Sequence, residues 1–300
     1  LEKKLFNRLN ISAGIRYEYN RIVGPEEVAG FTIPEGKTSE GKPIVRFGAN
    51  YQAGEATYFR ASWGQGYRFP TIAEKFITTN IGATPISPNP ELTSETGWSS
   101  EIGVKQGFQV SKWQGFLDVA AFWMEYEDMI EFVFTGFETG FQATNIGNTV
   151  IKGVEASIQG QGKIGGIPTS ILAGYTYIDP KFKDFSEQDR LRSSVDYNVL
   201  KYRFKHTVKL DIESQFNKFN VGIAMFRNSH MEAIDAIFEA LVVPGLGQYR
   251  AANNSGFYLF NARVGYQATE KLKLNFDAPE VAEYSIILGW QDCKYIFPVT

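Results

Sequence analysis

The stretch that decides the fold is Leu9–Asn20, LNISAGIRYEYN, in which apolar and polar residues alternate without a break. Its apolar residues share the odd positions: Leu9, Ile11, Ala13, Ile15, Tyr17 and Tyr19. Side chains of a β-strand point alternately to opposite faces, so this segment predicts a strand with one apolar and one polar face. It is also long enough to cross a bilayer as a tilted strand, which takes about 9–11 residues.

The same alternation returns along the whole chain, and we expect about twelve strands of this kind. They are centred on residues 9–20, 45–51, 59–69, 98–105, 117–123, 153–159, 173–177, 204–213, 219–225, 260–266, 272–276 and, as a short closing strand, 295–300. Polar positions on the second face include several charges that would line the interior: Arg16, Arg46, Arg60, Lys105, Glu155, Lys209, Asp211 and Arg263.

The connections between these strands are long and short in turn. The long ones cover residues 23–42, 70–96, 125–144, 179–201 and 228–254, and the short ones lie at residues 53–56, 109–112, 160–166, 216–218 and 268–271. Outer-membrane barrels have long loops on the outer face and short periplasmic turns. Tryptophan, tyrosine and phenylalanine at strand ends fit an interfacial aromatic belt. The predicted fold is therefore all-β, a transmembrane antiparallel β-barrel whose first strand runs outward.

Composition supports this fold and excludes several functions. Aromatic residues make up 15% of the chain, mean hydropathy is −0.22, and no apolar run approaches the roughly 18 residues of a transmembrane helix. A soluble β-sandwich also alternates, but its strands are shorter, at about 5–6 residues. The net charge of −3 argues against nucleic acid as a partner. With one cysteine, Cys293, and two histidines, His206 and His230, we expect no metal site and no cofactor.

Both ends of the sequence are irregular. The residues Leu1–Lys4 do not begin a signal peptide, because no apolar core follows them. Near the other end, Asp277–Val281 breaks the alternation, so either residues are absent near 277–282 or the last hairpin is irregular. We expect residues 1–300 to form one barrel portion that is incomplete at both ends.

Several motifs resemble those of one family, the TonB-dependent transporters of Gram-negative outer membranes. The first motif is Gly66–Glu74, GYRFPTIAE, and the second runs from Asn89–Leu92 through Glu95 to Glu101–Gly103. Further matches are Asn145–Asn148 with Gly153–Glu155, Gly174–Tyr177, and Arg203 with His206. These motifs cover most of the chain, and their residues are similar to those of the Bacteroidetes branch of the family.

This resemblance implies a 22-stranded barrel filled by an N-terminal plug domain, of which the chain carries about the last 12 strands. The plug, the energy-coupling motif and the earlier strands are not in this sequence, and the family's usual C-terminal aromatic is missing at Thr300. The implied location is the outer membrane. The implied partners are its lipid, a TonB-type energy-coupling protein acting through the plug, and a surface lipoprotein or larger outer-membrane complex.

Three segments are candidates for ligand contact in the outer loops. Arg68 lies where a strand meets a loop. This position is either a rim that contacts the ligand or a structural strand end, because Pro70 lacks an N–H and cannot continue the ladder. The loop that contains Phe132, Phe134, Phe137 and Phe141 exposes aromatic surface, which marks either a binding site or packing on a neighbour.

The third segment is the connection of residues 228–254. Residues Ser229–Leu241 have helical spacing and predict a short helix on the barrel rim or a lid. Tyr249 and Arg250 follow it, and the pair could hold an anionic ligand.

Three functions remain open at this point. The first is active uptake of a nutrient such as an iron chelate, cobalamin, a glycan or a peptide. The second is a transporter-like barrel that serves as a structural subunit of an outer-membrane complex. The third is an enzyme in a small barrel closed by twelve strands, which we do not expect, because His206 faces lipid and His230 has only Ser229 beside it, without an acid partner.

Overall fold

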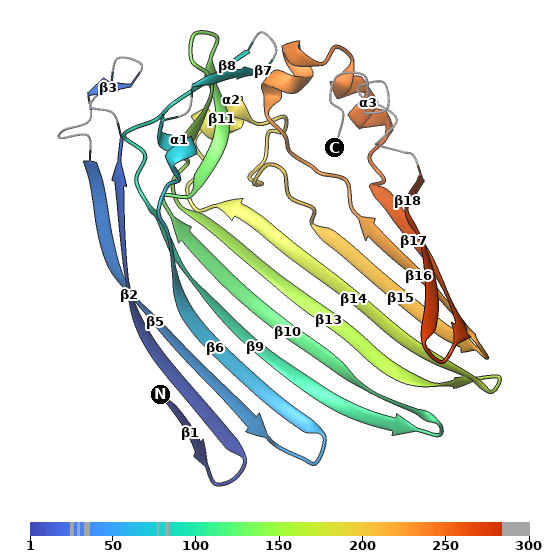
Figure 1. Ribbon diagram of the computed structural model, residues 1–300. Coiled ribbons are helices and arrows are strands. Elements are labelled where there is room, and N and C mark those ends of the chain that lie inside the picture. Colours follow the sequence, from blue (N-terminus) through green and yellow to red (C-terminus); the bar gives the residue numbers. More distant parts are fainter. Residues whose placement is uncertain (25–26, 29–30, 33–36, 77, 82–83, 284–300) are drawn as a thin grey trace.

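Twelve antiparallel strands form one strongly curved sheet, which we call the wall (Figure 1). This computed structural model describes residues 1–24, 27–28, 31–32, 37–76, 78–81 and 84–283. The strands are β1 (Glu2–Leu5), β2 (Leu9–Val23), β5 (Lys37–Gln52), β6 (Thr57–Arg68), β9 (Glu95–Val110), β10 (Trp113–Glu127), β13 (Thr149–Ile164), β14 (Ile167–Phe182), β15 (His206–Phe216), β16 (Phe219–Asn228), β17 (Phe257–Thr269) and β18 (Leu272–Glu283).

Each strand between β1 and β18 pairs with the strand before it and the strand after it in this series. The strands are tilted, short turns join them at one end, and long connections gather at the other (Figure 1). Among the described residues β1 and β18 have one neighbour each, so the wall is an open part of a barrel and not a small barrel closed by twelve strands. The predicted fold class, an antiparallel barrel portion, is confirmed.

Two details differ from the sequence prediction. Strand β1 was not expected; it pairs with the start of β2. The turn predicted over residues 160–166 is only two residues long, because β13 extends to Ile164 and β14 begins at Ile167. The two turn residues, Gly165 and Gly166, have φ angles of +56° and +87°. Such positive values give a turn that follows the twist of the sheet, and glycine adopts them at little cost. The predicted closing strand 295–300 lies outside the described residues.

The break in alternation at Asp277–Val281 does not end the last strand. Strand β18 continues through it to Glu283, and its pairing with β17 shifts between Phe260 and Ala262. A β-bulge adds unpaired residues to one strand and changes which side chains face which way. The last hairpin is therefore irregular, and the absence of residues near 277–282 stays a prediction.

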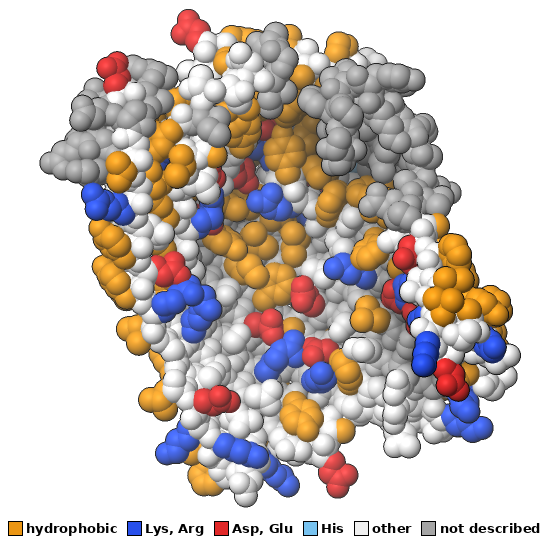
Figure 2. Space-filling model, viewed as in Figure 1, with side chains coloured by type: hydrophobic (Ala, Val, Ile, Leu, Met, Phe, Trp, Pro, Cys, Tyr) orange, Lys and Arg blue, Asp and Glu red, His pale blue; other side chains and the backbone are white. Residues whose placement is uncertain are grey.

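The apolar side of the alternation points out of the wall. Ile11, Phe47 and Ile102 are 40%, 53% and 66% exposed, and Trp63 and Val208 are half-buried, outside the buried core. The apolar wall residues that are buried have the opposite parity and include Ile22, Ile44, Ala120 and Ala224. In the view of Figure 2 basic and acidic side chains are scattered over the concave face among hydrophobic and other side chains. An apolar exterior around a polar interior is the arrangement of a membrane barrel.

On the inner face, each of two arginine side chains passes over a glycine of the neighbouring strand and contacts a carboxylate on the strand beyond it. Arg60 of β6 lies opposite Gly103 of β9 and contacts Asp118 of β10 at 2.6 Å and Glu101 at 2.7 Å. A Cβ at Gly103 would lie 2.7 Å from the Arg60 guanidinium carbon, so the glycine provides the path.

The second crossing repeats this geometry at the other side of the wall. Arg263 of β17 lies opposite Gly222 of β16 and contacts Asp211 at 2.7 Å and Glu213 at 3.0 Å, both on β15. The inward position predicted for Arg60, Asp211 and Arg263 is confirmed by these contacts.

The long connections contain their own secondary structure. A four-stranded sheet is made of β7 (Thr79–Ile81), β8 (Thr84–Ser87), β11 (Ile130–Gly136) and β12 (Gly140–Asn145), and a two-stranded one of β3 (Glu27–Val28) and β4 (Phe31–Thr32). The helices are α1 (Ile72–Phe76), α2 (Glu187–Arg192), the π-helix η2 (Phe238–Val242) and α3 (Leu246–Ala252). None of the described helices has the length and apolar character needed to cross a membrane.

The helix predicted over Ser229–Leu241 is wrong in its first half. Residues before Asp235 run extended beside the preceding connection, with isolated bridges from Met231 to Phe204 and from Asp235 to Ser193. Ile234 is buried by this pairing, whereas Leu241, on the π-helix, is 60% exposed. Tertiary pairing has overridden a local helical pattern.

Candidate functional site

The long connections pack into one body at the mouth of the wall, which we call the loop assembly: the described residues of 69–94, 128–148, 183–205 and 229–256. Strand β12 pairs in parallel with β8 and so joins the second and third of the five long connections. Side chains extend this seam. Ser87 Oγ donates to the carbonyl of Thr139 (2.7 Å), Asn89 Nδ2 to that of Ala143 (2.9 Å), and Gln142 Nε2 to that of Pro88 (2.6 Å).

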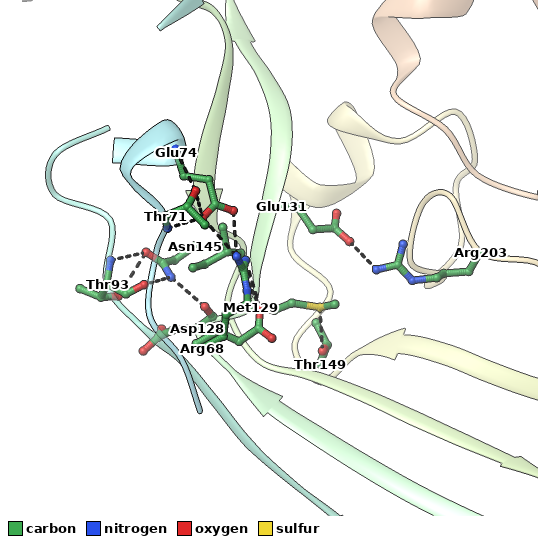
Figure 3. Close-up of polar contacts among 12 residues, drawn as sticks. Arg68, Thr71, Glu74, Thr93, Asp128, Met129, Glu131, Asn145, Thr149 and Arg203 are labelled. Atoms are coloured by element: carbon green, nitrogen blue, oxygen red, sulfur yellow. Dashed lines mark hydrogen bonds and ion pairs between the residues drawn. The ribbon is translucent and has the colours of Figure 1, made fainter. Parts of the chain in front are cut away.

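Asn145, part of a motif singled out in the sequence, closes the lower end of this seam (Figure 3). Its Oδ1 accepts hydrogen bonds from the backbone N–H (3.0 Å) and the hydroxyl (3.1 Å) of Thr93. Its Nδ2 donates to the carbonyls of Asp128 (2.7 Å) and Thr93 (3.1 Å). The amide is thus fully engaged within the protein, and its role is to position the loops.

Arg68, the first predicted contact residue, is held by two carboxylates at the end of β6 (Figure 3). Its guanidinium contacts Glu74 at 2.8 Å and Glu95 at 3.7 Å. Glu74 also accepts from the N–H and hydroxyl of Thr71, and the Thr71 hydroxyl accepts from the Glu74 N–H, so α1 starts with a capping box. Burial disfavours the Glu74 carboxylate, but the hydrogen bonds from Arg68 and Thr71 outweigh it and lower its pKa.

A buried carboxylate links the third connection to the fourth. Glu131 of β11 lies 3.4 Å from Arg203, and its side chain is 9% exposed (Figure 3). Burial raises the pKa of Glu131, opposed by the positive charges of Arg203 and Lys201.

The fourth and fifth connections meet at a second, more deeply buried ion pair. The Lys201 ammonium contacts the Asp235 carboxylate, and the two side chains are 5% and 3% exposed. Tyr202 donates to the other carboxylate oxygen at 2.8 Å and accepts from the Asp235 N–H at 3.2 Å. Burial, with the negative charge of Asp235, raises the pKa of Tyr202. Buried pairs of this kind are strongly disrupted when one partner is removed.

The phenylalanines of the third connection form a cluster that a fifth ring completes. Phe141 stacks on Phe132 and on Phe238 of η2, with ring centroids 5.5 Å apart in each case. Phe134 contacts Phe141 and Phe137 edge-on, also at 5.5 Å. Phe141 is buried, Phe134 is half-buried, and Phe137 is 75% exposed. Phe141 therefore packs within the protein and Phe137 presents apolar surface, and ligand contact by this loop stays a prediction.

Tyr249 and Arg250 are neighbours on α3, but their side chains leave the helix about 100° apart. The Arg250 guanidinium is engaged by Glu239 (2.6 Å) and by the carbonyls of Met231 (2.8 Å) and Glu232 (3.1 Å). Arg250 therefore braces the fifth connection. The binding of an anion by Tyr249 and Arg250 together stays a prediction.

Arg250 also lines a cavity of about 740 Å³ where β16 and β17 reach the loop assembly. Other residues that line it include Tyr197, Arg227, Ser229, His230 and Glu232. Arg227 Nε and His230 Nδ1 are buried and have no hydrogen-bond partner in the part of the chain that the structure describes. Burial, with the positive charge of Arg250, lowers the pKa of His230.

Of the six predicted contact residues, the structure brings Phe134, Phe137 and Phe141 together and leaves Arg68 and the Tyr249–Arg250 pair in separate parts of the assembly. Sequence reasoning missed Glu131, Lys201 and Asp235. The apolar pair Val199 and Leu200, both buried, directly precedes Lys201 and was a signal that this connection is packed. The described residues contain no group of three or more histidine, cysteine, aspartate and glutamate side chains suited to a metal ion.

An open antiparallel meander with an apolar exterior, a charged interior and long loops at one end defines the class of outer-membrane β-barrels. Within that class, a family described as "TonB dependent receptor-like, beta-barrel" matches residues 2–278. The chain belongs to this family of TonB-dependent receptors and carries its barrel region. The resemblance noted in the motifs is confirmed, and the barrels of this family lie in the outer membrane of Gram-negative bacteria.

Several known proteins are similar to this chain. The vitamin B12 transporter BtuB of Vibrio vulnificus is 34% identical over 97 residues, which are 32% of this chain and 14% of the transporter. The copper transporter OprC has a TM-score of 0.63 at 14% identity, covering 93% of this chain and 41% of its own. The ferric-catecholate import receptor Fiu of E. coli has a TM-score of 0.62 at 18% identity, covering 93% and 39%. The chain thus spans well under half of these relatives.

Proposed function

We propose that this chain is the barrel portion of a transporter that takes up a metal chelate or a corrinoid across the outer membrane. Support comes from the family and from its relatives. BtuB is named a vitamin B12 transporter, Fiu a ferric-catecholate import receptor and FyuA of Yersinia pestis a ferric yersiniabactin uptake receptor. In this proposal no bond is made or broken in the cargo. Energy would come from a TonB-type protein acting on a plug, and assignment to the Bacteroidetes branch stays a prediction.

The observation that carries this proposal is the loop assembly itself. Four long connections are fixed to one another by the β12–β8 seam, by Glu131 with Arg203 and by Lys201 with Asp235. Such fixed loops can hold a binding surface in place without the ligand, which reduces the entropy lost on binding. We assign ligand contact to the exposed side of the phenylalanine cluster, with Phe137 and Phe134 as contacts and Phe141 as their support.

The test is uptake by cells that carry the full-length gene on a deletion background. Cells are supplied with radiolabelled cobalamin or with ferric chelates as the only iron source. Uptake of at least one of these that requires the gene and an intact TonB protein supports the proposal. If no cargo depends on the gene while an outer-membrane complex is lost from the deletion strain, the chain is instead a structural subunit.

A pair of variants then locates the contact surface. Phe137→Ala should weaken cargo binding by about tenfold, the loss expected for one well-packed aromatic contact. Leu191→Ala is the matched control, because Leu191 is a comparably exposed apolar side chain of the loop assembly, on α2, outside the cluster. Equal binding by both variants and the parent protein would remove the cluster from the site.

A further inference from the structure

The outward face of the wall changes character just below the loop assembly. Deeper on this face, apolar residues such as Val154 and Ile223 are exposed, 43% and 55%, as expected of a surface against lipid tails. Above them on β13–β16, two basic residues of the same outward parity have no ion pair with a carboxylate among the described residues: Lys152 on β13 and Arg227 on β16.

Lys152 is seated on an aromatic ring. It lies directly opposite Trp123 of β10, and its ammonium is 3.9 Å from the centre of the Trp123 ring. Asp179, its partner on the other side, is already paired with Lys181 at 2.8 Å. The ring holds the ammonium at the surface through a cation–π contact and leaves its N–H donors free for an anion.

Arg227 repeats this arrangement three strands away. It lies opposite Val208 and Tyr258, both of outward parity, and its guanidinium is 5.5 Å from the Tyr258 ring centre. Arg227 also lines the cavity of about 740 Å³. The volume of this cavity is within the roughly 300–1,000 Å³ of small-molecule sites.

Polar aromatic residues fill the interval between the two cations. Tyr177 lies opposite His206, with rings 5.1 Å apart, and the Tyr175 hydroxyl is 2.8 Å from His206 Nδ1. Tyrosine and tryptophan collect at the level of lipid headgroups, where one end of the ring is apolar and the other is hydrated. Since neighbouring strands lie about 4.8 Å apart, the row from β13 to β16 spans about 14 Å across the wall.

We propose that this row binds anionic lipid headgroups in the leaflet next to the loop assembly, with the phosphate of one lipid at Arg227 and the phosphate of a second lipid at Lys152 on Trp123. The charges are complementary, and the row continues the lipid-facing surface directly, so acyl chains would lie along Val154 and Ile223. This site is separate from the phenylalanine cluster, and its test does not depend on nutrient uptake.

The experiment measures which lipids surround the full-length protein in phosphatidylcholine vesicles. Spin-labelled phosphatidylglycerol and spin-labelled phosphatidylcholine are compared by the fraction of label that is motionally restricted. Each basic residue near the surface should contribute about a fivefold preference for the anionic lipid. Lys152→Gln and Arg227→Gln should each reduce the preference by about that factor, and the double variant should reduce it further.

Matched controls decide the outcome. Lys112→Gln removes a lysine from a short turn at the opposite end of the wall and should leave the contribution of the row unchanged. Arg227→Lys keeps the charge and should keep most of the preference, and Lys152→Gln alone carries the test if Arg227 variants fail to fold. Ten millimolar inorganic phosphate that removes the preference would mean the row binds free phosphate and would overturn the lipid assignment. An unchanged preference in Lys152→Gln and Arg227→Gln would also overturn it.

Discussion

In the wall, the apolar face of the strands points out of the molecule, whereas the loop assembly buries apolar side chains such as Leu92 and Ile130 against one another. Among the described residues, two hydrophobic clusters of buried side chains both lie at the loop end: Leu92 with Ile130 and Ala143, and Met129 with Phe182 and Leu200. The wall depends on ladders of backbone hydrogen bonds and on lipid. The loop assembly is stabilised like a small water-soluble domain, by a core and buried ion pairs. The two regions should therefore respond differently to the same kind of damage.

The largest effect is expected from Asp235→Ala. The change leaves the Lys201 ammonium buried without its carboxylate, and removing one partner of a buried ion pair costs about 3–5 kcal/mol. Hydrogen exchange should rise across residues 193–205 and 229–242, while exchange in the wall stays slow. Asp196→Ala is the control, because Asp196 is 89% exposed in its pair with Arg190. Faster exchange throughout the wall would show that the two regions unfold together.

Gly153→Ala tests the wall in the same way. A Cβ at this inward position would lie 2.3 Å from the Phe122 ring and 2.4 Å from the carbonyl of Tyr177. Displacing a ring and a backbone carbonyl should cost about 1–3 kcal/mol. The urea midpoint for unfolding from vesicles measures this cost. Gly66→Ala is the matched glycine, because no atom of the described residues lies within 4 Å of its added Cβ. A midpoint equal to that of Gly153→Ala would contradict the steric account.

A smaller effect concerns pH and Glu131. Because the pKa of this carboxyl is raised in the folded state, its contribution to stability is fully present below the unfolded pKa and is lost as pH rises through the folded pKa. Protection of residues 128–148 from exchange should therefore be greater near pH 4 than near pH 8, relative to Glu131→Gln. The glutamine variant lacks this titration and keeps an acceptor for Arg203. The same pH dependence in both proteins would assign it to other groups.

The smallest change in stability is expected from Phe137→Ala. Exposed substitutions usually change stability by less than about 0.5 kcal/mol, and Phe137 is the most exposed ring of its cluster. Thermal unfolding of the loop assembly should be unchanged, so a loss of cargo binding in this variant would report on contact. Phe141→Ala, at a buried ring of the same cluster, should lower stability by about 3–5 kcal/mol. Similar destabilisation by both would mean that the cluster has no free face.

The same contrast explains what the sequence could predict. Alternation with period two is a local signal, so the strands around Phe47 and Trp63, their outward face and the long and short connections could be read directly. Loop residues carry no such period. The pairing of β12 with β8 depends on residues more than 50 positions apart, such as Ser87 and Thr139, and no local pattern announces it.

The candidate site was predictable only in part for the same reason. The density of phenylalanine in residues 132–141 indicated an aromatic surface, but the inclusion of Phe238 depends on a tertiary contact with η2. Arg250 looked like an anion ligand because a charged residue in a loop has no partner until the chain folds. The structure gives it Glu239 and two carbonyls.

The β12–β8 seam has a consequence for the order of folding. Each hairpin of the wall closes through neighbouring segments, whereas the seam requires that β9 and β10 have already brought the second and third connections to the same place. Closing long loops is entropically costly until other contacts hold the ends together. The seam can therefore form only late, and an antibody that recognises it would stain assembled barrels and ignore chains still awaiting insertion.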